Sequence, residues 1–515
     1  MKRVAFRVDA STIISSGHIM RCLTLADALR TQGAGIHFIC RGLSSIFELL
    51  ITQRGFVLHL LPVVDAKPNV DNDQEPAHAH WLGASWKEDA QASLDILESL
   101  GGVDLLVIDH YAIEARWERY VRVQVKTILV IDDLADRMHD CNFLLDQNLF
   151  TNQNVRYKPY LDEKTQCLLG PRYALLRPEF AQAQLAFPRG ERPLEPVKRV
   201  NICFGGLDSS GETIKALEAL NPWLNEEGLS VDVILTAASP HREAVETRAK
   251  QNAAITLHIS PDNLAELLTT ADLGLGASGS MTWERACVGL PSIVMAVAQN
   301  QQRPGEDAGR AGIHLFVGEN RVVSIEHLRL AVAFLRSNPL LRQGLAENCL
   351  RLIDGRGAQR VACRAIVPEI SLRKALMGDC KNVFVWRNDL VNRRHAHDSR
   401  EISYEEHQRW FENILKAEDR FLLIGSDENG PIGVLRYDYH ADHWMTSVYL
   451  VPERHGEGLG TPLLIKGLEW LRARCKGRII VQAEIRPENI ASQAAFERAG
   501  FKNLFSTLVI EVSEP

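Results

Sequence analysis

The sequence predicts an α/β protein with two successive doubly wound domains followed by a third, mixed α/β domain. Short apolar segments alternate with helical patterns from Met1 to Gln147 and again from Val200 to Val317. Such alternation is typical of parallel sheets that helices cover on both faces. From about residue 382 onward, several strands follow one another before helices resume. A chain of 515 residues is also too long for one hydrophobic core, which agrees with several domains.

The first domain, residues 1–165, is expected to contain a regular series of strands and helices. Its strands are predicted at Val4–Val8, Ile36–Cys40, Val57–Leu61, Leu105–Asp109, Ile128–Asp132 and Phe143–Leu145. Helical patterns lie at Met20–Arg30, Glu88–Leu100 and Ala115–Val121. Residues 148–195 are richer in Pro, Asn and Gln, and we predict a linker region there with a short strand at Leu168 and Leu169.

The second domain, residues 166–372, repeats this pattern. Its strands are predicted at Val200–Phe204, Val231–Leu235, Thr256–Ile259, Leu273–Leu275, Ser292–Met295 and His314–Val317. Its helices are predicted at Gly211–Leu220, Asn263–Thr269, Thr282–Val288, Ile325–Arg336, Pro339–Cys349 and Ala358–Ala365. Residues 373–382 are expected to form a linker. Two doubly wound domains leave a preferred place for ligands between them.

The third domain, residues 383–515, begins with a helical segment that contains Glu405, Glu406, His407 and Trp410. Three adjacent strands follow, and the turn at Asp427–Gly430 is a hairpin signal. A glycine-rich loop, a helix, a strand, a second helix and a last strand complete the domain. The predicted strands are Phe421–Gly425, Pro431–Tyr439, Met445–Val451, Ile479–Glu484 and Thr507–Val512.

The composition is that of an ordinary globular protein, 46% apolar and 24% charged. The formal net charge of −7 argues against binding to nucleic acid or to an anionic membrane, because both need a basic surface. Ten cysteines without a CxxC spacing indicate a reducing compartment and no zinc site. Because we find no signal-peptide segment and no uncharged apolar run of about 18 residues, we expect a cytoplasmic protein without a membrane span. The sequence leaves the oligomeric state open.

His18 closes the loop between the first strand and the first helix. The loop contains Ser15, Ser16 and Gly17, and in a doubly wound domain such a loop lies at the sheet edge where ligands bind. The N–H groups at the start of the following helix favour anions. A histidine there can act as a base beside a phosphate, or it can satisfy the first helical turn. Its position alone gives the two interpretations equal weight.

Two glycine loops in the second domain indicate a nucleotide-diphosphate site. Gly205 and Gly206 follow a strand and precede a helix, and the missing Cβ atoms let the backbone approach a ligand. The segment Gly276–Glu284 repeats this arrangement, with Glu284 in a first helical turn where it can accept hydrogen bonds from ribose hydroxyls. Taken alone, Ser280 and Glu284 are more simply explained by helix capping. Two such loops facing a histidine loop favour the ligand site.

A family resemblance covers about residues 1–372. The run ASGSMTWERACVGLP…AVAQNQ resembles sugar-nucleotide enzymes of the GT-B type, which pair two Rossmann-like domains. The segments RVDAS…GHIMRCLTLA, DHY, VIDDLADRMHDCNFLLDQNL and GPRYALLRPEF are similar to the UDP-2,4-diacetamido-2,4,6-trideoxy-β-L-altropyranose hydrolases of pseudaminic acid biosynthesis. The resemblance implies that water cleaves the anomeric C1–O bond with inversion and releases UDP. It implies His18 as general base or water-orienting group, with Tyr111 nearby. The expected UDP-sugar contacts are Gly17, Gly205, Gly206, Ser278, Gly279, Ser280, Glu284 and Asn300.

Three aspartates end predicted strands, where carboxylates can hold a metal ion: Asp109, Asp132 and Asp133. Aspartates at strand ends are usually turn or capping groups. The resemblance implies no metal, so we predict no metal site. Trp81 and Trp86 can either pack on a sugar or fill the core.

The third domain carries a second pair of motifs. Gly456, Gly458 and Gly460 expose consecutive N–H groups at a helix start, which suits a pyrophosphate. With Arg486–Ser492 and AAFERAGF they resemble the GNAT acetyltransferases over about residues 383–515, which implies acetyl-CoA as co-substrate. RNDLVNRR and EEHQRWF look like the N-acetyltransferases that supply the hydrolase with its substrate. The expected acetyl-CoA contacts are Val451, His455, Gly456, Gly458, Gly460, Thr461, Asn489 and Ser492.

Two positions depart from the GNAT pattern. His455, next to Arg454, occupies the Gln/Arg position of the glycine loop. Phe496 stands where many members carry a Tyr that protonates the departing thiolate, so another group or water must do this, or the step is slow. Glu484 is a candidate base that accepts a proton through water. The equal alternative is that Glu484 is an ordinary solvated carboxylate at the end of a strand. A module that only binds acetyl-CoA is a further alternative.

The sequence therefore predicts a bifunctional enzyme of nonulosonic acid synthesis. One part acetylates a UDP-linked 4-amino sugar, and the other hydrolyses the product to UDP and the free 2,4-diacetamido sugar. The two reactions are consecutive, which makes their fusion chemically sensible. The alternatives are a GT-B glycosyltransferase fused to an acetyltransferase and a non-catalytic sugar-nucleotide sensor. The stereochemistry of the sugar is left open.

Overall fold

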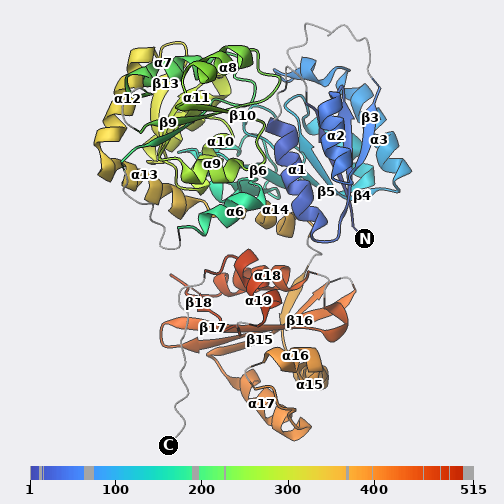
Figure 1. Cartoon of the computed structure of the whole chain (residues 1–515). Coiled ribbons are helices and arrows are strands. Elements are labelled where there is room, and N and C mark those ends of the chain that lie inside the picture. Colours follow the sequence, from blue (N-terminus) through green and yellow to red (C-terminus); the bar gives the residue numbers. More distant parts are fainter. Residues whose placement is uncertain are drawn as a thin grey trace, which may run out of the picture. The chain divides into compact units, whose positions relative to one another are not determined.

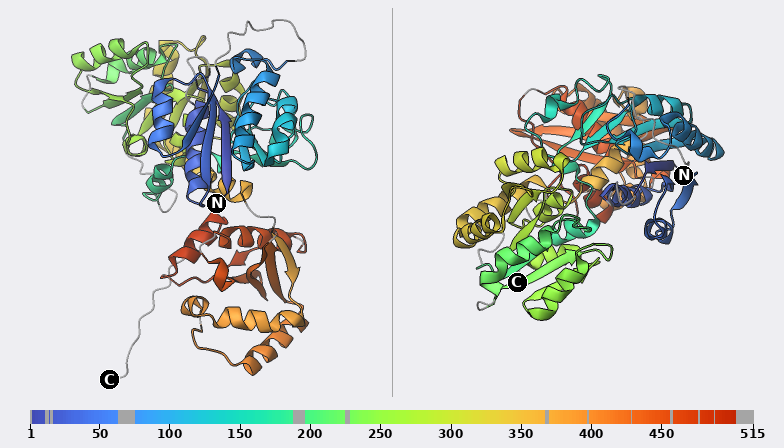
Figure 2. Two further views of the ribbon diagram at one scale, coloured as in Figure 1. Left: turned by 90° about the vertical axis from the view of Figure 1, so that its right-hand side faces the viewer. Right: turned by 90° about the horizontal axis from the view of Figure 1, so that it is seen from above.

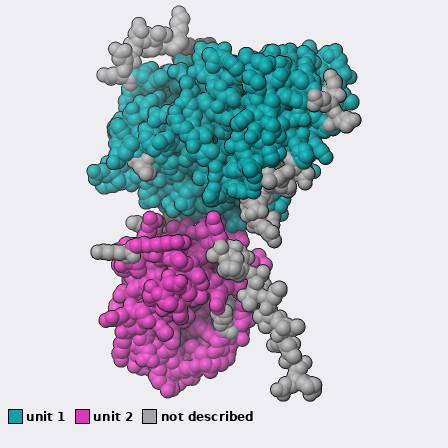
Figure 3. Space-filling view, turned by 90° about the vertical axis from the view of Figure 1, so that its left-hand side faces the viewer, with its two compact units in different colours: residues 1–365 teal, residues 366–515 magenta. Residues whose placement is uncertain are grey.

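The computed structural model divides into two compact units, Met1–Ala365 and Ile366–Pro515 (Figure 3). The residues it describes are 2–10, 14, 17–62, 75–187, 196–224, 228–366, 370–396, 398–427, 429–455, 458–475, 477–486 and 488–502. Unit 1 contains two parallel sheets, and unit 2 contains a mixed sheet (Figure 1).

The first sheet has seven parallel strands in the order β3-β2-β1-β4-β5-β6-β7. The strands are β1 (Arg3–Val8), β2 (Gly35–Arg41), β3 (Val57–Leu61), β4 (Val103–Asp109), β5 (Val125–Ile131), β6 (Phe143–Asp146) and β7 (Gln166–Leu169). Its helices are α1 (Gly17–Arg30), α2 (Ser45–Gln53), α3 (Trp86–Ser99), α4 (Ala115–Val121) and α5 (Gln153–Arg156). Side chains of β1 alternate between the faces: Ala5 packs towards α3 and α4, whereas Phe6 stacks on Phe38 on the other face. Both faces are covered, which explains the continuous apolar strands.

The second sheet has six parallel strands in the order β10-β9-β8-β11-β12-β13. The strands are β8 (Arg199–Cys203), β9 (Ser230–Leu235), β10 (Ile255–Ile259), β11 (Leu273–Ala277), β12 (Ser292–Ala296) and β13 (Leu315–Glu319). Its helices are α6 (Pro178–Gln184), α7 (Glu212–Leu224), α8 (Arg242–Gln251), α9 (Leu264–Thr270), α10 (Met281–Cys287), α11 (Gln299–Arg310), α12 (Ile325–Ser337) and α13 (Pro339–Leu352). One core joins α7 and α12 to the sheet, and a second joins α6, α9, α10 and α13.

The strand order of each sheet reverses next to its first strand. In the first sheet β2 lies on one side of β1 and β4 on the other, and in the second sheet β9 and β11 flank β8 in the same way. Doubly wound proteins bind ligands at such a reversal, beside the carboxyl ends of the strands. The predicted site residues of unit 1 follow β1, β4, β8, β11 and β12.

Residues 148–195 differ from the predicted linker. Strand β7 pairs with β6, so the first sheet extends past the expected boundary at residue 165. Helix α6 is anchored by Phe180, which is completely buried. The sequence also gave no signal for α2, α8 and α11. The last two are hard to recognise because α8 buries only Val245 and α11 buries mostly Gly305, Asp307 and Ala308.

Unit 1 ends with α14 (Gly357–Ala365), which packs against α1 of the first sheet. A hydrogen bond from Gln32 Nε2 to Cys363 Sγ, 3.3 Å long, joins the two segments. The chain therefore returns to the first sheet after completing the second. The left-hand view of Figure 2 shows the end of unit 1 near the N-terminus.

Unit 2 has a sheet in the order β14-β15-β16-β17-β18, antiparallel except for the parallel pair β17–β18. The strands are β14 (Ser371–Lys374), β15 (Arg420–Asp427), β16 (Gly430–His440), β17 (His443–Leu450) and β18 (Val481–Gln482). The helices are α15 (Cys380–Asn388), α16 (Leu390–His395), α17 (Tyr404–Lys416), α18 (Gly460–Arg472) and α19 (Ile490–Arg498). Helices α15 and α17 pack on one face, and α18 and α19 pack on the other.

Two predictions in this unit need correction, and a third concerns residues that the structure does not describe. The expected linker 373–382 contains the end of β14, which pairs with β15, and the start of α15. The strand expected at Ile479–Glu484 is reduced to β18, because the chain leaves β17 after two paired residues. The strand expected at Thr507–Val512 lies outside the described residues. No helix among the described residues is long and apolar enough to cross a membrane.

Candidate active sites

His18 and Asp109 form a buried pair at the point where the first sheet reverses its strand order. Helix α1 begins at Gly17, so His18 lies in its first turn, and its Nδ1 is 2.5 Å from Asp109 Oδ1. Because an ionised carboxylate only accepts hydrogen bonds, Nδ1 donates to Asp109, and the neutral form of the ring then has its lone pair on Nε2. Among the described residues, Nε2 has no hydrogen-bond partner. Ser15 and Ser16 of the predicted loop lie outside the described residues.

Arg21 holds Asp109 in its charged form. Its Nε and Nη2 donate to the two carboxylate oxygens at 2.6 and 2.7 Å. Burial alone would raise the pKa of Asp109, but Arg21 and His18 outweigh it and hold that pKa well below its usual range. Arg21 lies three residues after His18, on the same side of α1. The sequence carried this spacing, but nothing in it identified Asp109 as the common partner.

Tyr111 closes one side of this pair. Its ring meets the His18 ring edge to face, with 4.7 Å between the centroids, and its hydroxyl donates to Asp133 Oδ1 at 2.5 Å. Burial and the Asp133 charge raise the pKa of Tyr111 well above its usual value, so the phenol stays neutral. The Trp81 ring lies 5.6 Å from the Tyr111 ring. The structure thus brings together His18 and Tyr111 as predicted, with Trp81 beside them.

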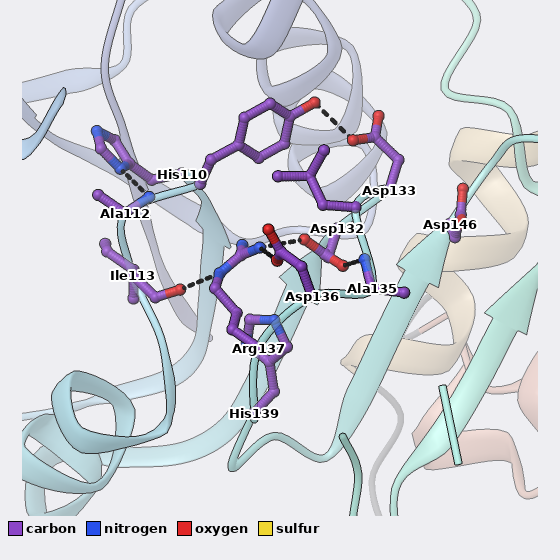
Figure 4. Close-up of polar contacts among 12 residues, drawn as sticks. His110, Ala112, Ile113, Asp132, Asp133, Ala135, Asp136, Arg137, His139 and Asp146 are labelled. Atoms are coloured by element: carbon purple, nitrogen blue, oxygen red, sulfur yellow. Dashed lines mark hydrogen bonds and ion pairs between the residues drawn. The ribbon is translucent and has the colours of Figure 1, made fainter. Parts of the chain in front are cut away.

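The loop after β5 positions Asp133. Arg137 Nη1 lies 2.8 Å from Asp132 Oδ1, and Arg137 Nε donates to the carbonyl of Ile113 (Figure 4). The Ala135 N–H donates to Asp132 Oδ2 at 2.9 Å, with Ala135 in the left-handed region at a φ of 52°. Asp132 is therefore a turn residue bonded to Arg137, and Asp133 faces the site.

A buried charge network fixes the end of β1 below the loop. Arg7 Nη1 pairs with Asp9 at 2.5 Å, and Arg7 Nη2 pairs with Asp89 at 2.8 Å. His110 Nε2 lies 3.2 Å from Asp9 Oδ2, and the Ala112 N–H donates to His110 Nδ1 (Figure 4). Burial lowers the pKa of His110, so this ring is neutral. It joins the end of β4 to Asp9 at the end of β1.

Polar contacts connect this site to the second sheet. Asn148 Nδ2 donates to Asp133 Oδ2 at 3.5 Å, and Trp283 Nε1 of α10 donates to Asn148 Oδ1 at 3.2 Å. Further along the same segment, the Thr151 hydroxyl donates to Asp307 of α11 at 2.8 Å. These contacts link the loops after β5 and β6 to the helices that follow β11 and β12. No motif in the sequence indicated these contacts, because each one joins two isolated polar residues that are far apart along the chain.

The first glycine loop follows β8. Gly205 has a φ of 102°, and a Cβ there would meet nothing within 4 Å, so the glycine is needed for its backbone conformation and faces open space. Gly206 is needed for packing, because a Cβ would lie 2.6 Å from Thr236 Cγ2. Asp208 accepts hydrogen bonds from the N–H groups of Glu212 and Thr213 and caps α7. Gly205 is therefore the glycine whose backbone is best placed for a ligand.

The second glycine loop follows β11. The Ser278 hydroxyl donates to the carbonyl of Gln301 at 2.8 Å, so this side chain ties the loop to α11. Gly279 lies against Gln301, and Ser280 is exposed at the start of α10 without a side-chain capping bond. Glu284 is partly exposed, and burial raises the pKa of its carboxyl. Asn300 is exposed in the first turn of α11.

Unit 2 contains the second set of predicted residues. Strands β17 and β18 pair only at Trp444–Val481 and Met445–Gln482 and then diverge. The loop that follows β17 begins at Val451, whose N–H donates to Ile432, and ends at Gly460, the first residue of α18. Gly458 has a φ of 73° with open space before it, and His455 is partly exposed. Gly456 lies outside the described residues.

Several predicted side chains in unit 2 have structural roles. Asn489 accepts from the Ser492 N–H at 3.1 Å and caps α19. Thr461 is buried and donates to the carbonyl of Ala495 at 3.3 Å. Phe496 is 5% exposed and packs in the core below α19. Glu484 lies beyond β18, exposed to solvent.

The described residues contain no group of three or more His, Cys, Asp or Glu that could hold a metal ion. The strand-end carboxylates have other partners: Asp109 and Asp133 contact Arg21, and Asp132 contacts Arg137. For acetyl-CoA, the diverging strands suit a thioester, and the open space at Gly458 before α18 suits a pyrophosphate. The backbone of unit 2 thus fits this co-substrate better than the side chains alone suggest.

Comparisons with known proteins agree with this division of the chain. Residues 386–501 match the model of the acetyltransferase (GNAT) family. An uncharacterised protein of Methanocaldococcus jannaschii is 22% identical over 97% of this chain and 96% of its own length. A spore coat polysaccharide biosynthesis protein of Bacillus subtilis is 25% identical over 40% of this chain and 60% of its own. The UDP-2,4-diacetamido-2,4,6-trideoxy-β-L-altropyranose hydrolase of Campylobacter jejuni is 22% identical over 58% of this chain and 93% of its own.

The predicted fold class is confirmed. Two parallel α/β sheets precede a mixed α/β domain, of which residues 386–501 match the GNAT family model. The predicted fusion is also confirmed, because the N-terminal region is homologous to the hydrolase and the C-terminal region matches the acetyltransferase model.

Proposed function

We propose, on the premise that the chain joins a region related to a UDP-sugar hydrolase to a GNAT domain, that it is a bifunctional enzyme of pseudaminic acid biosynthesis. Unit 1 hydrolyses UDP-2,4-diacetamido-2,4,6-trideoxy-β-L-altropyranose to UDP and the free sugar. Unit 2 acetylates the 4-amino group of the UDP-linked precursor with acetyl-CoA. The observation that carries the hydrolase proposal is the pairing of His18 with Asp109 beside Tyr111.

The geometry of His18 supports a general-base mechanism. A water oxygen attacks C1 of the sugar, the C1–O bond to the β-phosphate breaks with inversion, and its electron pair stays on UDP. His18 Nε2 accepts the proton of the attacking water, and Asp109 stabilises the imidazolium through Nδ1. General-base assistance of this kind is worth about 10²–10⁴ in rate. Tyr111 keeps the ring in position by its edge contact.

The two loops of the second sheet supply the proposed UDP site. The backbone N–H groups at Gly205 and at Gly279–Ser280 stabilise the departing diphosphate, which is the larger electrostatic contribution. The Glu284 carboxylate accepts from the ribose hydroxyls, and Asn300 lies at the start of α11 for a further contact. Ser278 contributes by its backbone, because its hydroxyl is bonded to Gln301.

Unit 2 transfers the acetyl group in this proposal. The loop from Val451 to Gly460 holds the pyrophosphate of acetyl-CoA by its N–H groups, with His455 beside it. The amine nitrogen attacks the thioester carbonyl of acetyl-CoA, the C–S bond breaks, and CoA leaves as a thiolate that takes a proton from water, while Glu484 accepts the proton of the attacking amine through water. Asn489 and Ser492 order the start of α19.

The two activities can be separated by paired variants of the full-length protein. His18→Ala should lower UDP release from the diacetamido substrate at least about a hundredfold and leave acetyl transfer unchanged. Glu484→Gln should do the reverse. Product mass spectrometry of candidate UDP-amino sugars, with and without acetyl-CoA, measures both. UDP release that survives His18→Ala largely intact would contradict the hydrolase proposal.

A further inference from the structure

Arg285 is a buried guanidinium that the proposed reactions leave without a role. It lies on α10 and is 2% exposed. Its Nη2 donates to the carbonyl of Ala277 at 2.7 Å, whereas Nε and Nη1 are buried without a hydrogen-bond partner. Among the described residues, no carboxylate forms an ion pair with it. The second sheet thus encloses an uncompensated positive charge.

Two glycines of β11 make room for this side chain. Leu273, Leu275 and Ala277 face the core on one side of the sheet, so Gly274 and Gly276 face the other. A Cβ at Gly274 would lie 3.2 Å from Arg285 Cδ, and a Cβ at Gly276 would lie 2.6 Å from Arg285 Nη1. The arginine therefore runs along β11 in a trough that any larger side chain would close.

The trough ends below the two glycine loops. The same Cβ at Gly276 would lie 2.5 Å from the carbonyl of Cys203, the last residue of β8. Ala277, which accepts from Arg285, is the last residue of β11. The next residues along the chain are Phe204–Gly205 in one strand and Ser278–Gly279 in the other. The guanidinium consequently lies at the base of both loops, between neighbouring strand ends.

The surroundings do not neutralise this charge. Burial lowers the pKa of Arg285 to about 10, so the group still carries its proton at neutral pH. Burial and the nearby charge of Arg285 lower the pKa of His314 to about 4, so His314 is neutral. The partly exposed Glu284 is the carboxylate that most affects it, and burial raises the pKa of that group. An unpaired buried charge is costly and calls for an anion.

We infer that Arg285 is an electrostatic positioning residue for the diphosphate of UDP. The guanidinium charge attracts an anion that the loops at Gly205 and Gly279 hold, and it does so without a direct contact to that anion. The inference rests on the proposed function, because that proposal puts the diphosphate on these loops. It predicts that Arg285 discriminates between a diphosphate and a neutral nucleoside.

Calorimetric binding of UDP and of uridine to the full-length protein tests the inference. Arg285→Met removes the charge and keeps an unbranched side chain. The UDP dissociation constant should rise about ten- to a hundredfold, and the uridine constant should stay within about threefold. Arg285→Lys should restore most of the UDP affinity at pH 7. An equal loss for both ligands, or an unchanged UDP affinity, would overturn the inference.

If Arg285→Met does not fold, the Arg285→Lys variant tests the inference instead. A buried lysine loses its proton more readily than arginine, so its UDP affinity should fall about tenfold between pH 7 and pH 9 relative to its uridine affinity. In the wild-type protein, the ratio of UDP affinity to uridine affinity should stay constant between pH 7 and pH 9. A constant ratio in the lysine variant would overturn the inference. Failure of the wild-type protein to bind UDP would instead contradict the proposed function.

Discussion

His18 and Asp109 belong to segments 91 residues apart, yet Nδ1 of one lies 2.5 Å from Oδ1 of the other. The strand order explains this contact, because β1 and β4 are neighbours and both loops leave the sheet at the same edge. The pairing sets the tautomer of His18, and Arg21 sets the charge of Asp109. The orientation of the His18 ring is therefore set by three side chains rather than one.

Replacing Asp109 by asparagine should test this dependence. The amide keeps the shape of the carboxylate, but it cannot stabilise an imidazolium, and its NH₂ group can donate to Nδ1 and favour the other tautomer. We expect kcat for UDP release to fall about 10²–10⁴-fold. Steady-state assays of UDP release measure the change, and acetyl transfer by unit 2 reports on the integrity of the rest of the chain.

Asp104→Asn is the matched control for this variant. Asp104 lies on the same strand, where it accepts from the Arg3 N–H and pairs with Lys126 on the surface. We expect its hydrolase activity to stay within about twofold of wild type. Equal activity losses in both variants would mean that β4 tolerates no amide, and not that Asp109 acts through His18.

Most of the fold could be predicted from the alternation of apolar segments. The strands of both parallel sheets were expected within a few residues, because buried parallel strands are continuous apolar runs. Helix α8 escaped prediction since only Val245 is buried, which leaves no apolar periodicity. Strand β7 was placed in a linker region because its neighbours are polar, although it pairs with β6.

The candidate sites could be predicted only where a motif is local. His18 and Gly205 stood out because strand, loop and helix follow one another in the sequence. Asp109 and Arg285 gain their significance from partners on other helices and strands, which no local pattern reveals. Thr461 and Asn489 also stood out from a local motif, and their side chains bond to the backbone near or within α19, so their contacts with acetyl-CoA stay predictions.

Asp146 should make stability depend on pH. Burial, reinforced by the charge of Asp133, raises the pKa of Asp146 from 3.8 to about 7, although Arg156 lies 2.7 Å away. Between these two values the folded protein binds more protons than the unfolded chain, so its free energy of unfolding falls as the pH rises. Asp146→Asn removes this titration. The variant should gain stability relative to wild type from pH 5 to pH 7, by at most about 1.4 kcal/mol per pH unit.

Urea unfolding of unit 1 at pH 5, 6, 7 and 8 measures this difference, and Asp95→Asn on the exposed side of α3 serves as control. A constant difference between Asp146→Asn and wild type at all four values would show that Asp146 is ionised throughout.

Two glycine-to-alanine variants should change stability in opposite directions. Gly276→Ala places a Cβ 2.5 Å from the Cys203 carbonyl and against Arg285, so we expect a loss of about 1–3 kcal/mol. Gly344→Ala, within α13, meets nothing within 4 Å and should gain roughly 0.5–1 kcal/mol from helix propensity. Chemical denaturation compares the two. Similar stabilities would mean that β11 shifts freely and that the trough for Arg285 is not rigid.

Phe496→Tyr tests whether the missing tyrosine of unit 2 can be restored at this position. Phe496 is 5% exposed, and its ring packs 4.9 Å from the Phe501 ring. A hydroxyl added there would be buried in an apolar core, so we expect a loss of about 1–3 kcal/mol in stability and no gain in acetyl transfer. Phe421→Tyr, in a partly exposed ring of the same core, should cost less. A faster acetyl transfer in Phe496→Tyr, with a new basic limb in its pH profile, would show instead that position 496 reaches the departing thiolate. The core packing favours the first outcome, in which the proton comes from water or from another residue.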